Sequence, residues 1–474
     1  MHVHLVGVAG TGMGALAGLL RSAGHRVTGS DTAFHPPMGE ALERWGIETR
    51  PGWDARNVAD RPDLVVVGNV CRADNVEARA ARELGLRTTS MPGALEELFL
   101  DRREGWVVAG THGKTTTTAL LAFLLDRLGR APGFLVGGIP KDWPESFRAA
   151  PEGAPFVIEG DEYDSAFFEK TPKFWRYRPR RVILTSIEHD HIDIYPDLAA
   201  YRAAFAGLIE RIPPDGTLVA FAGDPEVRAL ARRARCRVVH YGLQGDDWGD
   251  VAPEWVGAPI AAQGGMQPFD LFVGGSSAGP VLSPLAGAHN VRNTLAALAL
   301  VTEAAGGPVV LRDLFSALRT FRGVRRRQDR IGEARGVVVY DDFAHHPTAV
   351  RETTAALRAR HPEGKLIAVF EPRSATACRA LHQAAYAEAF HAADLAILAP
   401  LGRGNVAPEE RLDVAAVAEA IRAGGGAALA PADRDAVLAA IVEAARPGDT
   451  VLLMSNGDFG GMPDRLLAAL AVPR

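Results

Sequence analysis

One local pattern recurs along this chain: an apolar run rich in β-branched residues, a glycine-containing turn, and then a stretch with helical character. It occurs at residues 3–22 and again at residues 106–128. Beyond residue 337, further apolar runs alternate with helical segments. Parallel strands need a crossover connection, usually a helix, so this alternation predicts an α/β fold with parallel sheets.

The pattern divides the 474 residues into three α/β units, and we expect their bounds to be 1–104, 105–323 and 324–474. The charged stretch Asp101–Gly105 is the predicted linker between the first two units. The basic stretch Phe321–Arg327 is either a second linker or the edge of a binding site.

Composition excludes several classes of protein. Hydrophobic residues make up 47% and charged residues 23%, which is the balance of a globular chain and rules out disorder as the main state. A net charge of −5 gives no global reason to expect a nucleic acid or an anionic membrane as partner. Cys71, Cys236 and Cys378 are too sparse for a disulfide framework or a zinc ribbon. Without an apolar run of ~18 residues or a signal-peptide pattern, we expect a cytoplasmic protein.

The first glycine-rich turn leaves one predicted strand and enters a predicted helix. Its small residues let the backbone approach a diphosphate, and the helix N-terminus offers free N–H groups. Gly7-x-Ala9-x-x-Gly12 is close to the dinucleotide fingerprint, and Asp31 ends the next strand, where a carboxylate meets a ribose hydroxyl. These features favour a bound diphosphate, either NAD(P) or another, over a simple packing turn. The expected binding residues are Gly7, Ala9, Gly10, Thr11, Gly12, Met13 and Asp31.

The second turn follows the apolar run Trp106–Ala109 and predicts an ATP site. A strict P-loop has a glycine where Val108 stands, so this loop is a shortened variant. Backbone N–H groups cradle phosphates, Lys114 reaches the β- and γ-phosphates, and Thr115 is a ligand for Mg²⁺. Four consecutive threonines before the amphipathic helix expected at Ala119–Leu128 are poor helix formers, so propensity does not explain them. The expected ATP-binding residues here are Gly110, Thr111, His112, Gly113, Lys114, Thr115 and Thr116.

Two acidic clusters, at 159–164 and 188–193, each follow an apolar run. The carboxyl ends of parallel strands are where ligands bind in α/β sheets. Mg²⁺ takes a few carboxylates together with phosphates and waters, so Glu159 and His191 are candidate metal ligands facing the γ-phosphate. Zinc at His189 and His191 is the alternative, which the lack of nearby cysteines disfavours.

Asn290 and Asn293 precede a helix expected at Thr294–Ala305. Their amides lie three residues apart and match the edge of an adenine base. The alternative is that one of them is simply the helix N-cap.

Three polar segments follow three apolar runs in the last unit: Asp341–Thr348, Glu371–Ser374 and Ser455–Gly461. If those runs are parallel strands, the three segments meet at one edge of a sheet. Charged donors and acceptors gathered there suit a zwitterionic or peptide-like substrate.

In order and spacing, these motifs resemble those of the ATP-dependent Mur ligases, and the resemblance covers essentially the whole chain. The matching strings are Gly110–Thr116, Glu159–Asp164, Asp190-His191-x-Asp193, His289-Asn290-x-x-Asn293 and Asp341–Pro347. The resemblance implies a Rossmann-like N-terminal domain that binds UDP on the first turn, a central P-loop ATPase domain, and a Rossmann-like C-terminal domain that closes and presents the peptide.

The resemblance also implies roles for individual residues. Lys114 and Thr115 serve the phosphates and Mg²⁺, and Thr115, Glu159 and His191 are the metal ligands. Asn290, Asn293, Arg325 and Asp342 contact the adenosine part of ATP. His345, a candidate general base, lies near the substrates, as do the peptide-binding residues Arg373, Ser374, Ser455 and Asn456.

The implied reaction is ATP-dependent amide formation on UDP-N-acetylmuramate through an acyl phosphate. The strings Glu162–Phe168, Glu371–Ser374 and Met454–Gly457 resemble the recycling branch, which adds the tripeptide L-alanyl-γ-D-glutamyl-meso-diaminopimelate. The alternative is the branch that adds L-alanine. Both branches lack the carbamoylated lysine of other members, and Phe205 stands at that position here.

Two different classes stay open at this point. An NAD(P)-dependent oxidoreductase built on the first turn leaves the Lys114 loop unexplained, and the other alternative is a non-catalytic nucleotide-binding regulator. We expect small-molecule partners only, with no nucleic acid and no membrane, and a monomer or a homodimer.

Overall fold

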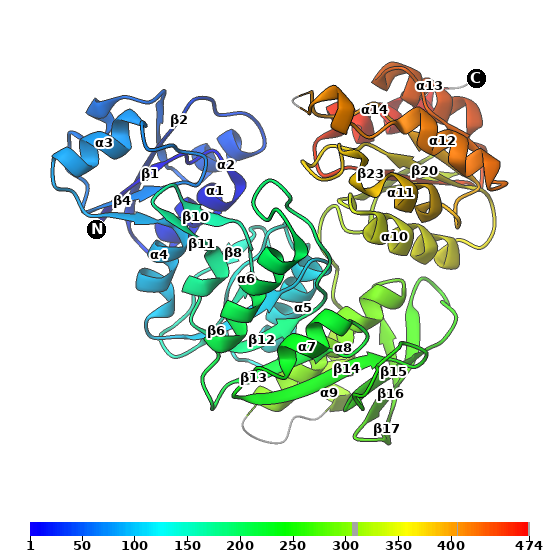
Figure 1. Ribbon diagram of the computed structural model, residues 1–474, viewed down its shortest axis with the longest axis horizontal. Helices are drawn as coiled ribbons and strands as arrows, with labels where there is room; N and C mark the ends of the chain where they lie inside the picture. Colours follow the sequence, from blue (N-terminus) through cyan, green and yellow to red (C-terminus); the bar gives the residue numbers. More distant parts are fainter. Residues whose placement is uncertain (306–310, 405, 473–474) are drawn as a thin grey trace.

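The computed structural model describes residues 1–305, 311–404 and 406–472. Three main sheets follow one another along the chain, each with helices packed on it (Figure 1). The prediction of an α/β fold with parallel sheets is confirmed. The exact domain bounds stay a prediction.

The first sheet is fully parallel, in the order β3-β2-β1-β4-β5. Strand β4 is buried at every position, as expected for a parallel sheet covered on both faces. The strand order reverses beside β1, which makes the end of β1 the switch point where open α/β sheets bind ligands. The elements are β1 (His2–Val6), α1 (Thr11–Ser22), β2 (Arg26–Asp31), α2 (Met38–Arg44), β3 (Glu48–Pro51), β4 (Leu64–Val67), α3 (Val76–Glu83), β5 (Thr88–Ser90) and α4 (Met91–Leu95).

The central sheet has the order β17-β16-β15-β14-β13-β12-β6-β9-β7-β8, parallel from β7 to β15 and antiparallel at β8, β16 and β17. Its strands are β6 (Glu104–Ala109), β7 (Gly133–Leu135), β8 (Phe147–Arg148), β9 (Pro155–Glu159), β12 (Pro179–Leu184), β13 (Thr217–Phe221), β14 (Arg237–Leu243), β15 (Trp255–Pro259), β16 (Gln267–Val273) and β17 (Ser276–Ser283). A separate hairpin joins β10 (Asp164–Ala166) to β11 (Glu169–Pro172). Strand β6 begins at Glu104, inside the stretch expected to be a linker.

The helices of the central unit are α5 (Lys114–Arg127), α6 (Leu198–Glu210), α7 (Pro225–Ala231), α8 (Ala288–Ala304) and α9 (Leu311–Leu318). Helix α5 begins at Lys114, five residues before the expected start at Ala119, and takes in all four threonines. It is not amphipathic, because every residue from Thr115 to Leu125 is buried and the helix packs against α8, β6 and β9. Burial against its neighbours outweighs the weak helix propensity of threonine.

The C-terminal sheet has the order β18-β19-β23-β20-β21-β22, and only β18 runs antiparallel to its neighbour. Separate apolar clusters cover its two faces, so helices lie on both sides. The elements are β18 (Asp329–Ala334), β19 (Val337–Asp342), α10 (Pro347–Arg360), β20 (Leu366–Phe370), α11 (Gln383–Ala389), β21 (Leu395–Leu398), α12 (Val414–Ala423), β22 (Ala428–Leu429), α13 (Arg434–Ala444), β23 (Thr450–Met454) and α14 (Met462–Ala471). In the part of the chain that the structure describes, no helix has the length and apolar character needed to cross a bilayer.

Candidate functional site

The first glycine turn lies at the end of β1 and leads into α1. Gly7 has φ +89°, a left-handed conformation that favours glycine, and no side chain caps the first turn of α1. Gly10, Thr11 and Gly12 are exposed, whereas Met13 is buried in the core. Asp31 accepts a hydrogen bond from the Ala9 amide at 2.9 Å. Asp31, expected at a ribose, therefore holds the turn itself in this structure.

In the second turn, the Lys114 side chain folds back onto the backbone of the turn itself. The Lys114 ammonium donates to the carbonyl oxygens of Gly110 at 2.6 Å and Thr111 at 3.3 Å, and to the Glu162 carboxylate at 2.9 Å. Gly113, in the left-handed region at φ +79°, precedes the helix, whose first amides have no side-chain cap. Uncapped amides and a lysine beside them form an anion-binding helix start.

Glu162 is the partner of Lys114, and its role was missed because nothing in the sequence separates it from its acidic neighbours. Its side chain is 2% exposed and also accepts from His191 Nε2 at 3.0 Å and from the Tyr201 hydroxyl at 3.2 Å. Burial raises the pKa of Glu162, but the Lys114 ammonium and His191 outweigh it and lower that pKa to about 2.

This shift predicts a pH-dependent contribution to stability. A carboxyl group whose pKa falls from 4.5 to about 2 on folding stabilises the fold above pH 4.5, and that contribution is lost as the pH falls toward 2. We expect the urea concentration at the midpoint of unfolding to be well below the wild-type value for Glu162→Gln at pH 7. The difference between the two midpoints should shrink as the pH falls from 4.5 to 2. Glu152→Gln, at an exposed pair with Arg102, serves as control and should show no such gap.

Thr115 and Glu159 meet beside the second glycine turn, residues 110–114, which we call the phosphate loop because the sequence predicts phosphate binding there. The Thr115 hydroxyl donates to Glu159 Oε1 at 2.9 Å, and Glu159 Oε2 accepts from the Gly137 amide at 2.8 Å. Burial raises the pKa of Glu159, with the Lys114 charge opposing it. His191, expected beside Glu159, instead makes its hydrogen bond to Glu162. A hydroxyl and a carboxylate held together suit a hard cation such as Mg²⁺.

A cavity of about 310 Å³ opens between the phosphate loop, the start of α8 and the start of α10. Helix α8 begins at Ala288 with Gly287 as its N-cap residue, so the expected start at Thr294 is wrong. Asn290 and Asn293 consequently lie inside the helix, and the N-cap alternative for them is wrong as well. Asn293 Nδ2 donates to Asn290 Oδ1 at 3.0 Å, and both residues line the cavity. The other lining residues include the predicted ATP ligands His112, Gly113, Thr116 and Asp342.

The basic stretch at 321–327 both connects the last two units and forms part of the cavity. Arg325, expected at ATP, has an exposed side chain, and its amide donates to the Ile139 carbonyl at 2.9 Å. Arg327 lines the cavity instead, and its guanidinium donates to the Thr115 hydroxyl at 3.1 Å. Asp342 is buried beside it and accepts from the Gln328 amide at 2.6 Å. Burial raises the pKa of Asp342, and the Arg327 charge opposes that rise.

The three polar segments of the C-terminal unit meet at one sheet edge, as their sequence positions predict. Strands β19, β23 and β20 are neighbours. The Ser455 hydroxyl donates to Glu371 Oε2 at 2.7 Å, and the Ser455 amide donates to the Asp342 carbonyl at 3.1 Å. Hydrogen bonds therefore connect the three segments directly.

The residues expected to bind the peptide substrate lie along this same edge. Arg373 donates to the exposed Asp458 carboxylate at 3.0 Å, and Ser374 Oγ accepts from the Ala377 amide at 3.0 Å. The buried Asn456 Oδ1 has no hydrogen-bond partner among the residues that the structure describes. None of these residues is among those that line the cavity beside the phosphate loop, but an unsatisfied buried acceptor is a natural contact for an incoming donor.

His345 faces the central unit from the loop after β19. Its Nδ1 lies 3.0 Å from the Phe343 carbonyl oxygen, and its Nε2 lies 4.0 Å from Asp190 Oδ2. Burial lowers the pKa of His345, so the ring is neutral at pH 7 and able to accept a proton.

An uncapped helix start with a lysine beside it suits a nucleotide phosphate, and comparison with protein families identifies the class of enzyme. Residues 2–103 match the Mur ligase family catalytic domain, residues 108–301 the Mur ligase middle domain, and residues 326–457 the Mur ligase, glutamate ligase domain. The chain belongs to the Mur ligase family. It is an ATP-dependent ligase that forms a carbon–nitrogen bond, which excludes the oxidoreductase and regulator alternatives.

Individual relatives align over nearly the whole chain. The UDP-N-acetylmuramate–L-alanyl-γ-D-glutamyl-meso-2,6-diaminoheptandioate ligase of Escherichia coli is 38% identical, covering 99% of this chain and 98% of that protein. The UDP-N-acetylmuramate–L-alanine ligase of a Roseiflexus species is 36% identical over 97% of each chain. The crystal structure of a murein peptide ligase from Psychrobacter arcticus is 33% identical, with a TM-score of 0.70, covering 100% of this chain and 99% of that one.

Proposed function

We propose that this ligase joins UDP-N-acetylmuramate to L-alanyl-γ-D-glutamyl-meso-diaminopimelate, using ATP, in the recycling of peptidoglycan in the cytoplasm. The observation that carries the proposal is that the phosphate loop and the Asp341–Thr348 segment of the polar sheet edge line one cavity. Arg327 contacts both, because its guanidinium donates to the Thr115 hydroxyl and lies over the Phe343 ring, 4.8 Å from the ring centroid. Coupled phosphorylation and amide formation require that the three substrates lie together in one site.

The chemistry follows from what an amide bond needs. A muramate carboxylate oxygen attacks the γ-phosphorus, the bond to the β-phosphate oxygen breaks, and ADP leaves. The peptide amine then attacks the acyl carbon of the acyl phosphate, the carbon–oxygen bond breaks, and phosphate leaves. Lys114 neutralises charge on the phosphates once ATP has displaced Glu162 from it. His345 is the proposed acceptor of the proton that the amine loses.

Mg²⁺ fits the residues present at Thr115 and Glu159, because a hydroxyl and a carboxylate oxygen are already in contact there beside the phosphate loop. When bound, the ion supplies charge neutralisation at the β- and γ-phosphates. We propose these two residues as its ligands, whereas His191, the third candidate, hydrogen-bonds to Glu162 in this structure. The uncapped start of α1 at the first glycine turn is the proposed site for the UDP diphosphate.

The choice of amine is the first point to test. Incubation with ATP, Mg²⁺ and UDP-N-acetylmuramate, together with equal amounts of the tripeptide and L-alanine, should give the tripeptide product as the main species by mass spectrometry. One ADP should form for each bond made. Dominance of the L-alanine product would contradict the proposed substrate and favour the second branch of the family.

The acyl phosphate is tested separately by isotope transfer. UDP-N-acetylmuramate labelled with oxygen-18 in its carboxylate should pass one labelled oxygen to inorganic phosphate, because that oxygen bridges carbon and phosphorus in the intermediate. Phosphate mass spectrometry measures the transfer, and label transferred to AMP instead would contradict attack at the γ-phosphorus. Omitting the amine is the control, since release of labelled phosphate then falls.

A further inference from the structure

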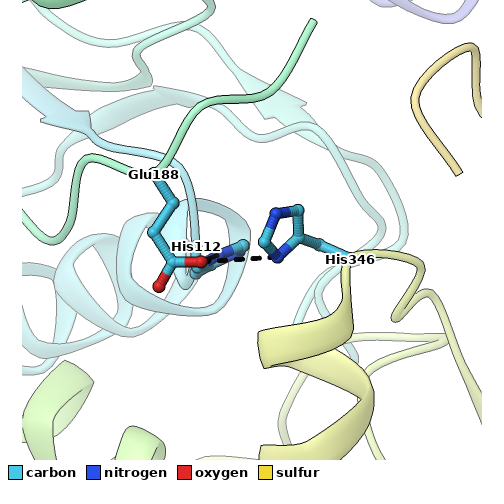
Figure 2. A group of neighbouring side chains, drawn as sticks. All are labelled: His112, Glu188 and His346. Atoms are coloured by element: carbon cyan, nitrogen blue, oxygen red, sulfur yellow. Dashed lines mark hydrogen bonds and ion pairs between the residues drawn. The ribbon is translucent and has the colours of Figure 1, made fainter. Parts of the chain in front are cut away.

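Three potential metal ligands from distant parts of the chain meet beside the cavity (Figure 2). His112 lies in the phosphate loop, Glu188 lies in the loop after β12, and His346 is the residue that directly precedes α10. His112 Nε2 lies 3.2 Å from Glu188 Oε2, and His346 Nδ1 lies 3.4 Å from the same oxygen. One donor atom from each residue lies within 4.8 Å of the other two.

The hydrogen bonds around this cluster identify two of its atoms as acceptors. His346 Nδ1 accepts from the Thr348 amide at 3.4 Å as the N-cap of α10, so this nitrogen presents a lone pair. Glu188 Oε2 already accepts from the Thr348 hydroxyl at 2.7 Å. His346 Nδ1 and Glu188 Oε2 therefore lie 3.4 Å apart, and each of them accepts a hydrogen bond from Thr348. A cation between these two atoms takes the Nδ1 lone pair that now accepts only a long, 3.4 Å hydrogen bond from the Thr348 amide.

We propose that His112, Glu188 and His346 form a binding site for a divalent transition-metal ion of the Zn²⁺ type. Two imidazoles and one carboxylate are ligands that zinc prefers, whereas Mg²⁺ prefers oxygen alone. Bonds of about 2.0–2.1 Å in tetrahedral geometry place neighbouring ligand atoms roughly 3.4 Å apart, so the two shorter separations need little change. The zinc alternative raised by the sequence, at His189 and His191, gains no support here, because among the described residues neither belongs to a group of three side chains placed to hold a metal ion.

Access to the cluster comes from a second cavity of about 270 Å³. Glu188, His189, His346 and His382 are among its lining residues. The His346 side chain is 7% exposed and that of Glu188 is 38% exposed, so the site is sheltered but reachable. The cavity leaves room for water at the fourth coordination position. A metal ion bound there connects the phosphate loop to α10, at a place separate from the proposed Mg²⁺ ligands Thr115 and Glu159.

The test uses the full chain, which is first freed of metal by a chelator and is kept without ATP or other substrates. Zn²⁺ is titrated calorimetrically with excess Mg²⁺ present, and Co²⁺ is titrated in parallel to read its visible absorption. We expect one equivalent of Zn²⁺ with a micromolar or lower Kd, and Co²⁺ bands of tetrahedral intensity. No saturable binding of either ion would overturn the proposal. Because the assay contains no substrate, its result does not depend on the proposed ligase reaction.

Variants locate the ion. His346→Asn keeps an N-cap acceptor for α10 while it removes the imidazole, and Glu188→Gln keeps an acceptor for Thr348. Each should bind Zn²⁺ at least about tenfold more weakly, since even outer-shell changes cost 10–100-fold in affinity. His391→Asn, at an exposed histidine, and Glu159→Gln should bind like the wild type. Unchanged affinity in both cluster variants, or loss of binding in Glu159→Gln, would place the ion elsewhere and overturn the proposal.

Discussion

Replacing Lys114 with alanine is expected to lower kcat for ATP turnover by about 10³-fold, the size of effect seen when one preorganised charge contact to a transition state is removed. The ammonium is held at the phosphate loop by two carbonyl oxygens, so it is in place before the nucleotide arrives. Burial lowers the pKa of Lys114, but the Glu162 charge outweighs this and raises it, which keeps the lysine protonated. Phosphate release in the presence of all substrates measures the effect.

Two further variants separate the loss of catalysis from a loss of folding. Removing Lys114 leaves Glu162 as a buried charge with a weaker set of partners, and breaking such a pair costs about 3–5 kcal/mol of stability. Adding Glu162→Gln should raise the thermal midpoint above that of Lys114→Ala without restoring turnover. Lys170→Ala, which removes an exposed lysine paired with Asp164, should leave both unchanged. Near-normal turnover in Lys114→Ala would contradict the role given to this residue.

Structural features that depend on residues close together in the sequence were predicted well. The two glycine turns lie where the pattern places them, because a strand end, a left-handed glycine and a helix start are fixed within a few residues of one another. The meeting of the Asp342, Glu371 and Ser455 segments was also predicted, since parallel strands in one sheet end at the same edge.

Features set by distant packing were not predicted. Helix α5 takes in poor helix formers because α8 and the central sheet bury them, and α8 extends six residues earlier than expected for the same kind of reason. Arg325 and Arg327 are indistinguishable in a basic run, and only the fold shows that the second one faces Thr115. Glu162 likewise stands in an acidic run whose members differ only in which distant cation they meet.

Replacing Gly113 with alanine is expected to lower ATP turnover by about 10²-fold. Gly113 has φ +79°, and a Cβ atom there would lie 2.4 Å from Asn293 Oδ1, so Asn293 or the phosphate loop must shift. A misplacement of ~1 Å at a reacting site costs about that factor.

Gly129→Ala isolates this clash from backbone strain. Gly129 has nearly the same conformation, φ +72°, at the other end of α5, and a Cβ atom there would meet nothing within 4 Å. Both variants should lose roughly 1–2 kcal/mol of stability, because alanine is strained in the left-handed region. Only Gly113→Ala should lose turnover and ATP affinity, measured by phosphate release and by titration with a non-hydrolysable ATP analogue. Equal turnover in the two variants would mean that contact between the phosphate loop and Asn293 does not position the nucleotide.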